Sequence, residues 1–435
     1  MKVHQIALIS VTLVWQLAAM PVFAVDVSQT SALQAADITS VSDWFEDPVL
    51  SRFWTLAQTT SPELVSRQRK YQAAQRSAQA ARALPDPQLS GGVRNVGVGR
   101  FSIGSEPMSG ASLALQQNYP NPQKLEIKQA IADRQALLLI LDWQWQQKKI
   151  RRDIQQHYFK ALQQRQMQRV LTEMTHWYAL LQKIVETRYQ VGKVPLQDIW
   201  QVKLRRSELE QQQLLLAQAE QLHWTALRQT LGWPDPFQVP SVQTYPVMAS
   251  LPPLSPTLPD RRHPELRLQR LQTELSQWAL KMAEAEQESD YFISGGMTQR
   301  VTLEMIWELR AGMTLPIYGE TKNKPLIDAA ELQLQSAEAN TLAVEQRLQS
   351  QWETAYTQWQ YSQRQQALYA NQILPEAKAS VESALAAYQG GQRDVAQVIE
   401  SIARWLRYQE QELALQAQTY VALSELEYLT SGETP

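Results

Sequence analysis

One long helical pattern constrains this chain more than any other feature. From Gln123 to Tyr189 the sequence contains neither proline nor glycine, and apolar residues recur three and four positions apart. At 1.5 Å per residue, a helix of this length extends about 100 Å. A globular core cannot cover such a helix, so we expect partner helices to pack along it as in a coiled coil.

The pattern ends at a turn that recurs later in the chain. Residues Tyr189–Lys193 read YQVGK, and residues Tyr388–Gln392, 199 positions further on, read YQGGQ. Each turn lies between two helical stretches. Glycine stands at the same offset from the tyrosine because a helix that ends and reverses commonly needs a residue that tolerates positive φ. The matched turns indicate an internal duplication.

Three further markers repeat in the same order. Pro-Glu-Leu at 62–64 returns 202 positions later at 264–266, and the Gly-Gly pair at 91–92 returns 204 positions later at 295–296. Pro120, which ends a strand pattern, returns 196 positions later as Pro316. Each half therefore predicts a helix, a β-hairpin, a long helix, a turn and a returning helix, and Pro375 is expected to kink the second long helix.

The N-terminus carries Lys2 and an apolar run from Ile6 to Met20. This pattern predicts a secretory signal peptide cut after Ala24. The alternative is a membrane anchor, but the run is shorter than the roughly 20 residues that a membrane span needs.

The markers divide the rest of the chain. Residues 25–61 form an irregular segment with a short helix, and Ser61 is expected to cap the helix that starts at Pro62. The remaining boundaries are a first repeat at 62–231 (strands about 88–119, helical hairpin about 123–231), a proline-rich connector at 232–263, and a second repeat at 264–432 (strands about 290–316, helical hairpin about 322–429).

Composition excludes several classes of protein. The formal net charge is -2, so there is no basic field for nucleic acid. The absence of cysteine excludes disulfides, thiolate metal sites and lipid attachment through cysteine. The five histidines lack ligand spacing, and no catalytic triad or phosphate loop is present, so we expect no enzyme, cofactor or metal site. Methionines near the hairpins are interpreted as packing residues: Met108, Met297, Met305 and Met313.

Four strands cannot close a barrel, because even small barrels need about eight. An isolated four-stranded sheet also leaves two open edges. Three copies would supply twelve strands and remove the edges. Together with the signal peptide, this predicts a mainly α fold with a small β part: a trimeric twelve-stranded outer-membrane β-barrel continued by a periplasmic α-helical coiled-coil tube.

The whole plan resembles the TolC family of outer-membrane efflux ducts. Residues 84–90, 106–108 and 116–125 are similar to the heavy-metal efflux branch, the CzcC-like or CusC-like proteins. Two features depart from the family pattern. There is no cysteine for the lipid anchor of some members, and the chain stops just after the last helix.

The resemblance implies a homotrimer in the outer membrane of a Gram-negative-type cell, in contact with outer-membrane lipid. It also implies a periplasmic adaptor that docks on the turns and an inner-membrane pump that supplies the energy. The implied docking residues are Val191, Gly192, Lys193, Gly390, Gly391 and Gln392. The implied periplasmic gate residues are Tyr388, Arg393, Asp198 and Glu400, with Arg393 paired to Asp198 and Glu400 in an acidic ring.

Simpler interpretations of these residues stay open. The turn glycines can be mere helix stops, and the charged residues can be solvated groups near helix ends. A different function also stays open, that of a periplasmic coiled-coil adaptor or scaffold without a channel. Adaptors carry one helical hairpin inserted into β-rich domains, whereas this chain carries two.

Overall fold

The structure is a computed structural model that describes residues 44–95, 108–232, 238–242, 244–248, 254–256, 263–301 and 303–430. The predicted signal peptide, the first part of the irregular segment, most of the first hairpin loop and much of the proline-rich connector lie outside these residues. The described residues all fall within one compact unit, Trp44–Ser431.

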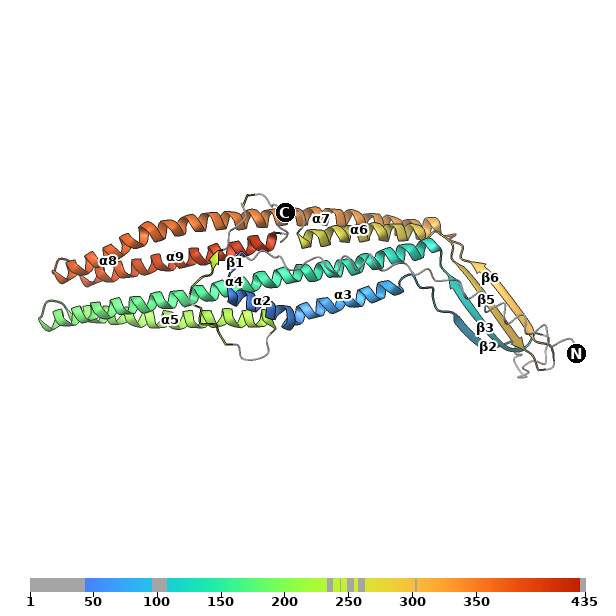
Figure 1. The fold of residues 1–435 in the computed structure, drawn as a ribbon, viewed down its shortest axis with the longest axis horizontal. Helices are drawn as coiled ribbons and strands as arrows, with labels where there is room; N and C mark the ends of the chain where they lie inside the picture. The colour runs from blue at the N-terminus through green and yellow to red at the C-terminus, as the bar shows by residue number, and fades with distance from the viewer. Residues whose placement is uncertain are drawn as a thin grey trace. The chain divides into compact units, whose positions relative to one another are not determined.

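The element order repeats within this unit (Figure 1). The first repeat contains α3 (Pro62–Ala80), β2 (Gln88–Arg94), β3 (Gly110–Tyr119), α4 (Pro122–Gln190) and α5 (Leu196–Leu231). The second contains α6 (Pro264–Ala285), β5 (Tyr291–Gln299), β6 (Ile306–Met313), η3 (Gly319–Asn323), α7 (Lys324–Leu368), η4 (Tyr369–Ile373), α8 (Leu374–Gln389) and α9 (Val395–Leu429). Helix α2 (Pro48–Thr60) precedes both repeats, and two short strands, β1 (Phe45–Glu46) and β4 (Val247–Met248), pair with each other.

Three helix starts, those of α2, α4 and α6, combine a proline in the first turn with a capping side chain. Asn121 accepts a hydrogen bond from the Gln123 N–H at 3.0 Å, which starts α4, and Asp47 caps α2 at 2.7 Å. The prediction for Ser61 is wrong in one respect. Ser61 stands at the cap position of α3, but its side chain makes no capping hydrogen bond, so Pro62 and the acid Glu63 mark this start without it.

Pro375 does not break the second long helix. The five residues before Leu374 form a π-helical turn, η4, in which the Leu374 N–H bonds to the Tyr369 carbonyl. A wider turn shifts the hydrogen-bond register, so the helix continues through the residue that lacks an N–H. Pro325 follows η3 in the same way.

The four long strands form one antiparallel sheet in the order β2-β3-β5-β6. Each hairpin pairs with itself, and the two repeats join where β3 meets β5, with Leu113 opposite Met297. Strands β2 and β6 are therefore the sheet edges, and each has one row of backbone groups without a strand partner among the described residues.

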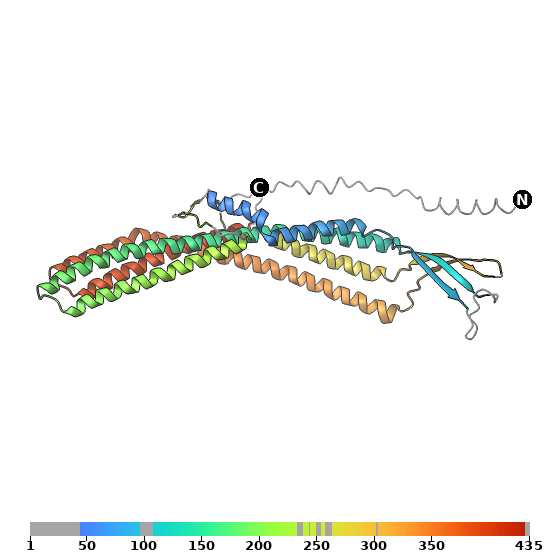
Figure 2. The same ribbon diagram turned by 90° about the horizontal axis from the view of Figure 1, so that it is seen from below.

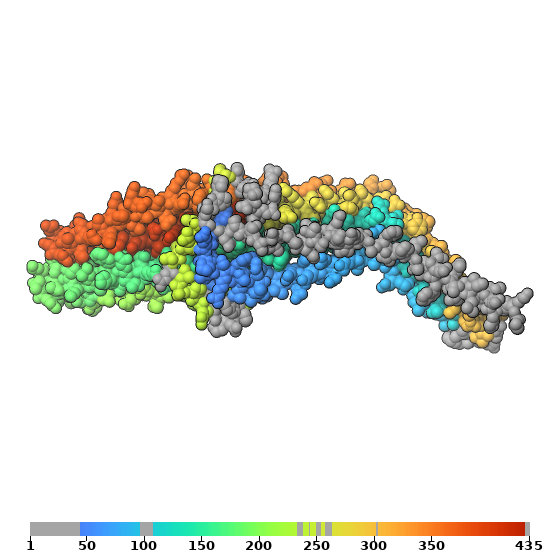
Figure 3. All heavy atoms as spheres, viewed as in Figure 1, coloured from blue at the N-terminus to red at the C-terminus, as the bar shows by residue number. Residues whose placement is uncertain are grey.

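The helices pack in pairs along their length (Figure 2). A first core cluster, with Tyr158, Phe159 and Trp224 fully or nearly buried, joins α2, α4, α5, α7 and α9. The Tyr158 hydroxyl donates to the Asp47 carboxylate at 2.7 Å, so the segment before α2 is tied to α4. A second cluster joins α4, α5, α8 and α9 as they run to the two turns, and Figure 3 shows both hairpins reaching the same end of the unit.

Among the described residues, no helix combines the length and the apolar character that crossing a membrane requires.

Candidate functional site

The two matched turns have the same backbone geometry. Gly192 and Gly391 adopt left-handed φ angles of 71° and 79°, whereas Gly390 has an ordinary helical φ of -70°. In the first turn the Lys193 N–H bonds to the Arg188 carbonyl at 2.9 Å, and in the second the Gln392 N–H bonds to the Ala387 carbonyl at 2.9 Å. Both are Schellman endings, which satisfy helix carbonyls that would otherwise lack partners.

Arg188 connects the two turns. It lies in the last helical turn of α4, and its guanidinium donates hydrogen bonds to the main-chain carbonyls of Tyr388 and Gln389, the latter at 3.4 Å. The same guanidinium lies 4.7 Å from the centroid of the Tyr388 ring. A Cβ added to Gly391 would lie 3.6 Å from an Arg188 nitrogen, an ordinary van der Waals contact, so glycine is favoured here by its positive φ and not by the approach of Arg188. A cation at carbonyls that end a helix is favourable because of the helix dipole.

Two carboxylates lie near this link. Burial raises the pKa of Asp198, the Asp394 carboxylate raises it further, and Arg188 opposes both effects. Burial also raises the pKa of the Tyr388 hydroxyl, and Asp198 adds to that shift. The first acid after each turn, Asp198 or Asp394, and Arg188 therefore all act electrostatically on the Tyr388 hydroxyl.

The structure places the four predicted gate residues differently from one another. Tyr388 is only 1% exposed and packs in the second core cluster, and Asp198 is half-buried. Arg393 is exposed and forms no ion pair with any described residue. Glu400 is also exposed and pairs along its own helix with Arg404 at 2.6 Å. The sequence predicted that an Arg393–Asp198 pair would join the two turns. Within one chain, Arg188 joins them instead, through the Tyr388 and Gln389 carbonyls.

The predicted docking residues all lie at the surface. Val191 is 63% exposed, and the two turn glycines and their neighbours Lys193, Gly390 and Gln392 are exposed as well. In the part of the chain that the structure describes, no atom lies within 4 Å of a Cβ added to Gly192. The main chain of the first turn is therefore open to another molecule.

Sequence reasoning missed Arg188 and Asp394. Arg188 has no counterpart in the second repeat, where the equivalent position is Ala387. The signal available in the sequence was this difference beside a matched turn: the first repeat has an arginine where the second has an alanine. Such a difference indicates a contact that only one of the two turns makes.

The sheet is the second functional region, and its two faces differ. One face, which we call the apolar face, exposes large hydrophobic side chains on all four strands. They are Leu89, Val93, Leu113, Leu115, Tyr119, Tyr291, Ile293, Trp307, Leu309 and Met313. Trp307 and Leu309 are 76% and 82% exposed, values that a water-soluble sheet rarely shows across a whole face.

The opposite face, which we call the polar face, carries charged and small residues. Its members include Ser90, Arg94, Ser112, Gln116, Asn118, Ser294, Thr298, Glu308 and Arg310. Arg94 on β2 forms an ion pair with Glu308 on β6 at 3.2 Å, and Arg310 contacts the same carboxylate. This alternation is the pattern of a sheet with one side in lipid and the other in water.

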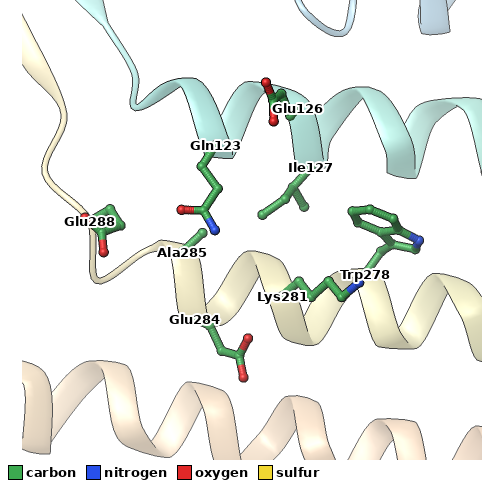
Figure 4. A pocket seen from close by; sticks show the side chains of 8 residues that line it. All are labelled: Gln123, Glu126, Ile127, Trp278, Lys281, Glu284, Ala285 and Glu288. Atoms are coloured by element: carbon green, nitrogen blue, oxygen red, sulfur yellow. The ribbon is translucent and has the colours of Figure 1, made fainter.

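A cavity of about 440 Å³ lies between the start of α4 and the end of α6 (Figure 4). Gln123 and Ile127 point from α4 toward α6, where Lys281 lies 4.2 Å from the Trp278 ring. The lining offers glutamates and one lysine but no nucleophile with a base beside it. Within the described ranges, no three His, Asp or Glu side chains come together as metal ligands.

Comparisons with known proteins agree with this geometry. Residues 299–432 match the family model described as Outer membrane efflux protein. Among solved structures, the chain is similar to CusC (16% identity, TM-score 0.76, 88% of this chain and 92% of that one) and to VceC of Vibrio cholerae (18%, 0.74, 89% and 97%). It is also similar to the outer-membrane channel OprN (13%, 0.77, 89% and 91%). No curated protein matches the chain.

The family model covers most of the second repeat, and the structural matches extend over both repeats. The family consists of channels rather than enzymes, and its members lie in the outer membrane and extend into the periplasm. Residues 299–432 thus match the outer membrane efflux protein family, and both repeats share the fold of outer-membrane channels such as CusC and VceC.

Proposed function

We propose that three copies of this chain form a passive export duct, the outer-membrane component of a tripartite efflux system. The sheets of the three copies close a twelve-stranded barrel, and the helical hairpins continue it as a tube into the periplasm. An inner-membrane pump supplies the energy, and a periplasmic adaptor joins the pump to the duct.

One observation carries the proposal: the four-stranded sheet has an exposed apolar face and two edge strands, β2 and β6, whose outer sides pair with no other described strand. A single copy in water would leave both the apolar side chains and the edge backbone groups unsatisfied. Pairing β2 of one copy with β6 of the next satisfies the edges. Lipid then covers the apolar face, and the polar face lines the lumen.

The two turns form the periplasmic mouth in this proposal. The exposed residues Val191–Lys193 and Gly390–Gln392 dock the adaptor, which can approach the open backbone at Gly192. Tyr388, Asp198, Arg393 and Glu400 make up the gate region, with Arg393 free to pair with a neighbouring copy. Exposed pairs contribute only about 0–1 kcal/mol each, so a threefold set biases the mouth without locking it.

Heavy-metal cations are the substrate class that the similarity of residues 84–90, 106–108 and 116–125 suggests. The test is a deletion strain challenged with metal salts and, separately, with organic drugs. Selective metal sensitivity supports this class, and selective drug sensitivity rejects it.

The competing function, a periplasmic adaptor or scaffold, leaves the apolar face of the sheet without a role. The two functions separate in one experiment. Purified protein should depend on detergent, behave as a trimer and conduct ions in planar lipid bilayers. A detergent-independent monomer with no conductance would reject the duct.

A further inference from the structure

The polar face of the sheet carries more positive than negative charge. Arg94, Arg310 and Glu308 meet there, with the Arg94–Glu308 pair at 3.2 Å and Arg310 on the same carboxylate. The two partners of the first pair come from opposite edge strands and from different repeats, 214 positions apart. A single carboxylate therefore serves two guanidinium groups.

Arg300 adds a third cation at the same end of the sheet. Its Cγ lies 3.3 Å from the position that a Cβ on Gly110 would occupy, and Gly110 alternates with Ser112 on the polar face. The Arg300 Nε donates to the main-chain carbonyl of Glu304 at 2.6 Å. Even with the Glu304 carboxylate counted, this end has three arginines against two acids. Residues 96–107 of the adjoining loop carry one arginine and one glutamate and so add no net charge.

Small residues let these long side chains lie across the sheet. Between Arg94 and Glu308 the polar face presents Gly110 and Gly296, and no Cβ blocks the path at either position. Added Cβ atoms at Gly110 and Gly296 would lie within 3.3 Å of neighbouring atoms. Of the charged side chains, only Arg300 has an atom near an added Cβ: its Cγ would lie 3.3 Å from a Cβ at Gly110, which is paired with Arg94.

We propose that Arg94, Arg300, Arg310 and Glu308 form a positively charged ring in the lumen at the membrane end of the duct, and that this ring favours anions over cations. The proposal rests on the proposed duct, because only closure of three copies turns the polar face into a lumen wall. Rings of fixed arginine or lysine charge are a known source of anion preference in pores. A positively charged exit disfavours free metal cations. A measured anion preference would therefore argue against free heavy-metal cations as the substrate class.

The range of the effect depends on salt. Fixed charges act over about 30 Å at 0.01 M ionic strength, about 10 Å at 0.1 M and about 3 Å at 1 M. A wide lumen should therefore show the preference at low salt and lose it at high salt. This dependence separates an electrostatic ring from a change in pore width.

The test uses the full-length trimer in planar bilayers with a tenfold KCl gradient between 10 and 100 mM, and the reversal potential is the readout. The double variant Arg94→Gln with Arg310→Gln should shift the reversal potential toward the K⁺ equilibrium potential. Glu308→Gln should shift it toward the Cl⁻ equilibrium potential. Arg94→Lys with Arg310→Lys is the charge-conserving control and should keep the wild-type value. All shifts should shrink in a gradient near 1 M.

The two charge-changing variants distinguish an electrostatic effect from misfolding. If these residues had only a structural role, removing positive charge and removing negative charge would not shift the reversal potential in opposite directions. Trimers that conduct with the wild-type reversal potential in both variants overturn the ring and leave the duct intact. Wild-type protein that does not conduct at all overturns the duct and the ring together.

Discussion

Arg188, at the end of α4, donates hydrogen bonds to the main-chain carbonyls of Tyr388 and Gln389, and its guanidinium lies 4.7 Å from the Tyr388 ring centroid. One side chain of the first repeat thus completes the helix ending of the second. In the proposed duct, this contact holds together the two turns that each copy contributes to the periplasmic mouth.

Replacing Arg188 by glutamine should loosen the mouth. Hydrogen bonds from a charged donor contribute about 1.5–3 kcal/mol, and partial exposure of Arg188 favours the lower end of that range. A loss near 1.4 kcal/mol raises an open-to-closed ratio about tenfold. The measurement is the open probability of single channels in bilayers. Arg205→Gln is the matched control, since the ion pair of Arg205 with Glu208 lies at an exposed site on α5. Equal open probabilities in both variants would show that Arg188 does not hold the periplasmic mouth closed.

The adjacent glycines 390 and 391 should respond oppositely to alanine. Gly391 has φ 79°, where a Cβ costs about 1–2 kcal/mol, so Gly391→Ala should loosen the second turn. Gly390 has φ -70°, and a Cβ there would lie 3.6 Å from its nearest neighbours, so Gly390→Ala should be neutral or stabilising by up to about 1 kcal/mol. Hydrogen–deuterium exchange of residues 384–398 measures both effects. Faster exchange in Gly390→Ala than in Gly391→Ala would contradict the assigned geometry.

The junction between helices and sheet should depend on Lys124. Its side chain is only 5% exposed and lies 3.1 Å from Asp290 and 3.6 Å from Glu286. Asp290 also accepts the Asn121 N–H at 2.8 Å, so it connects the start of α4 to the start of β5. Lys124→Met should cost about 1–2 kcal/mol of stability, discounted because Asp290 is partly exposed.

Thermal unfolding followed by circular dichroism measures the cost of Lys124→Met. Lys324→Met is its control, because Lys324 and Glu320 form a pair that is 63% and 84% exposed and should contribute close to nothing. An equal loss of stability in both variants would show that the buried Lys124 contacts stabilise the fold no more than an exposed ion pair does.

Acid should destabilise the fold through His263. This residue is fully buried, caps α6 through its Nδ1 and contacts the Tyr428 ring edge to face at 5.2 Å. Burial, with Lys148 nearby, lowers the pKa of His263 to about 3. The unfolded chain takes up a proton below its ordinary pKa near 6.5 and the folded chain does not, so stability falls as pH decreases from 6.5 toward 3.

Between pH 7.5 and 5.5 this linkage removes about 1.4 kcal/mol per chain. His263→Asn keeps a capping side chain but cannot titrate, so its unfolding should depend less on pH than that of the wild type. The difference between the two unfolding midpoints, measured at both pH values, isolates His263 from the other histidines. An identical pH dependence in the two proteins would show that His263 is not responsible.

Helix positions followed from the sequence closely. The pattern from Gln123 to Tyr189 corresponds to α4 at Pro122–Gln190, and the helical hairpin predicted to end near residue 231 ends with α5 at Leu231. Proline starts, left-handed glycine ends and a period near 3.6 are local properties, which is why they can be recognised without a structure. At Pro375 a π turn accommodates the missing donor within the helix, a local change that the periodicity does not reveal.

Contacts between distant segments were harder to foresee. Arg188 reaches a carbonyl 200 positions away through a long flexible side chain, and periodicity does not describe such a reach. The burial of Tyr388 depends on how two hairpins pack, whereas its counterpart Tyr189 is 43% exposed. The opposite faces of the sheet needed the strand register, because a shift of one residue exchanges them.

The central claim is that neighbouring copies pair β2 with β6 to close the sheet, and the absence of cysteine allows a direct test. Leu89 on β2 is changed to cysteine together with, in turn, Trp307, Leu309 or Ala311 on β6, all on the apolar face. After mild oxidation in membranes, non-reducing gel electrophoresis should show covalent dimers and trimers for at least one pair and none for either single cysteine. Monomers alone for every pair would contradict closure of the sheet by three copies.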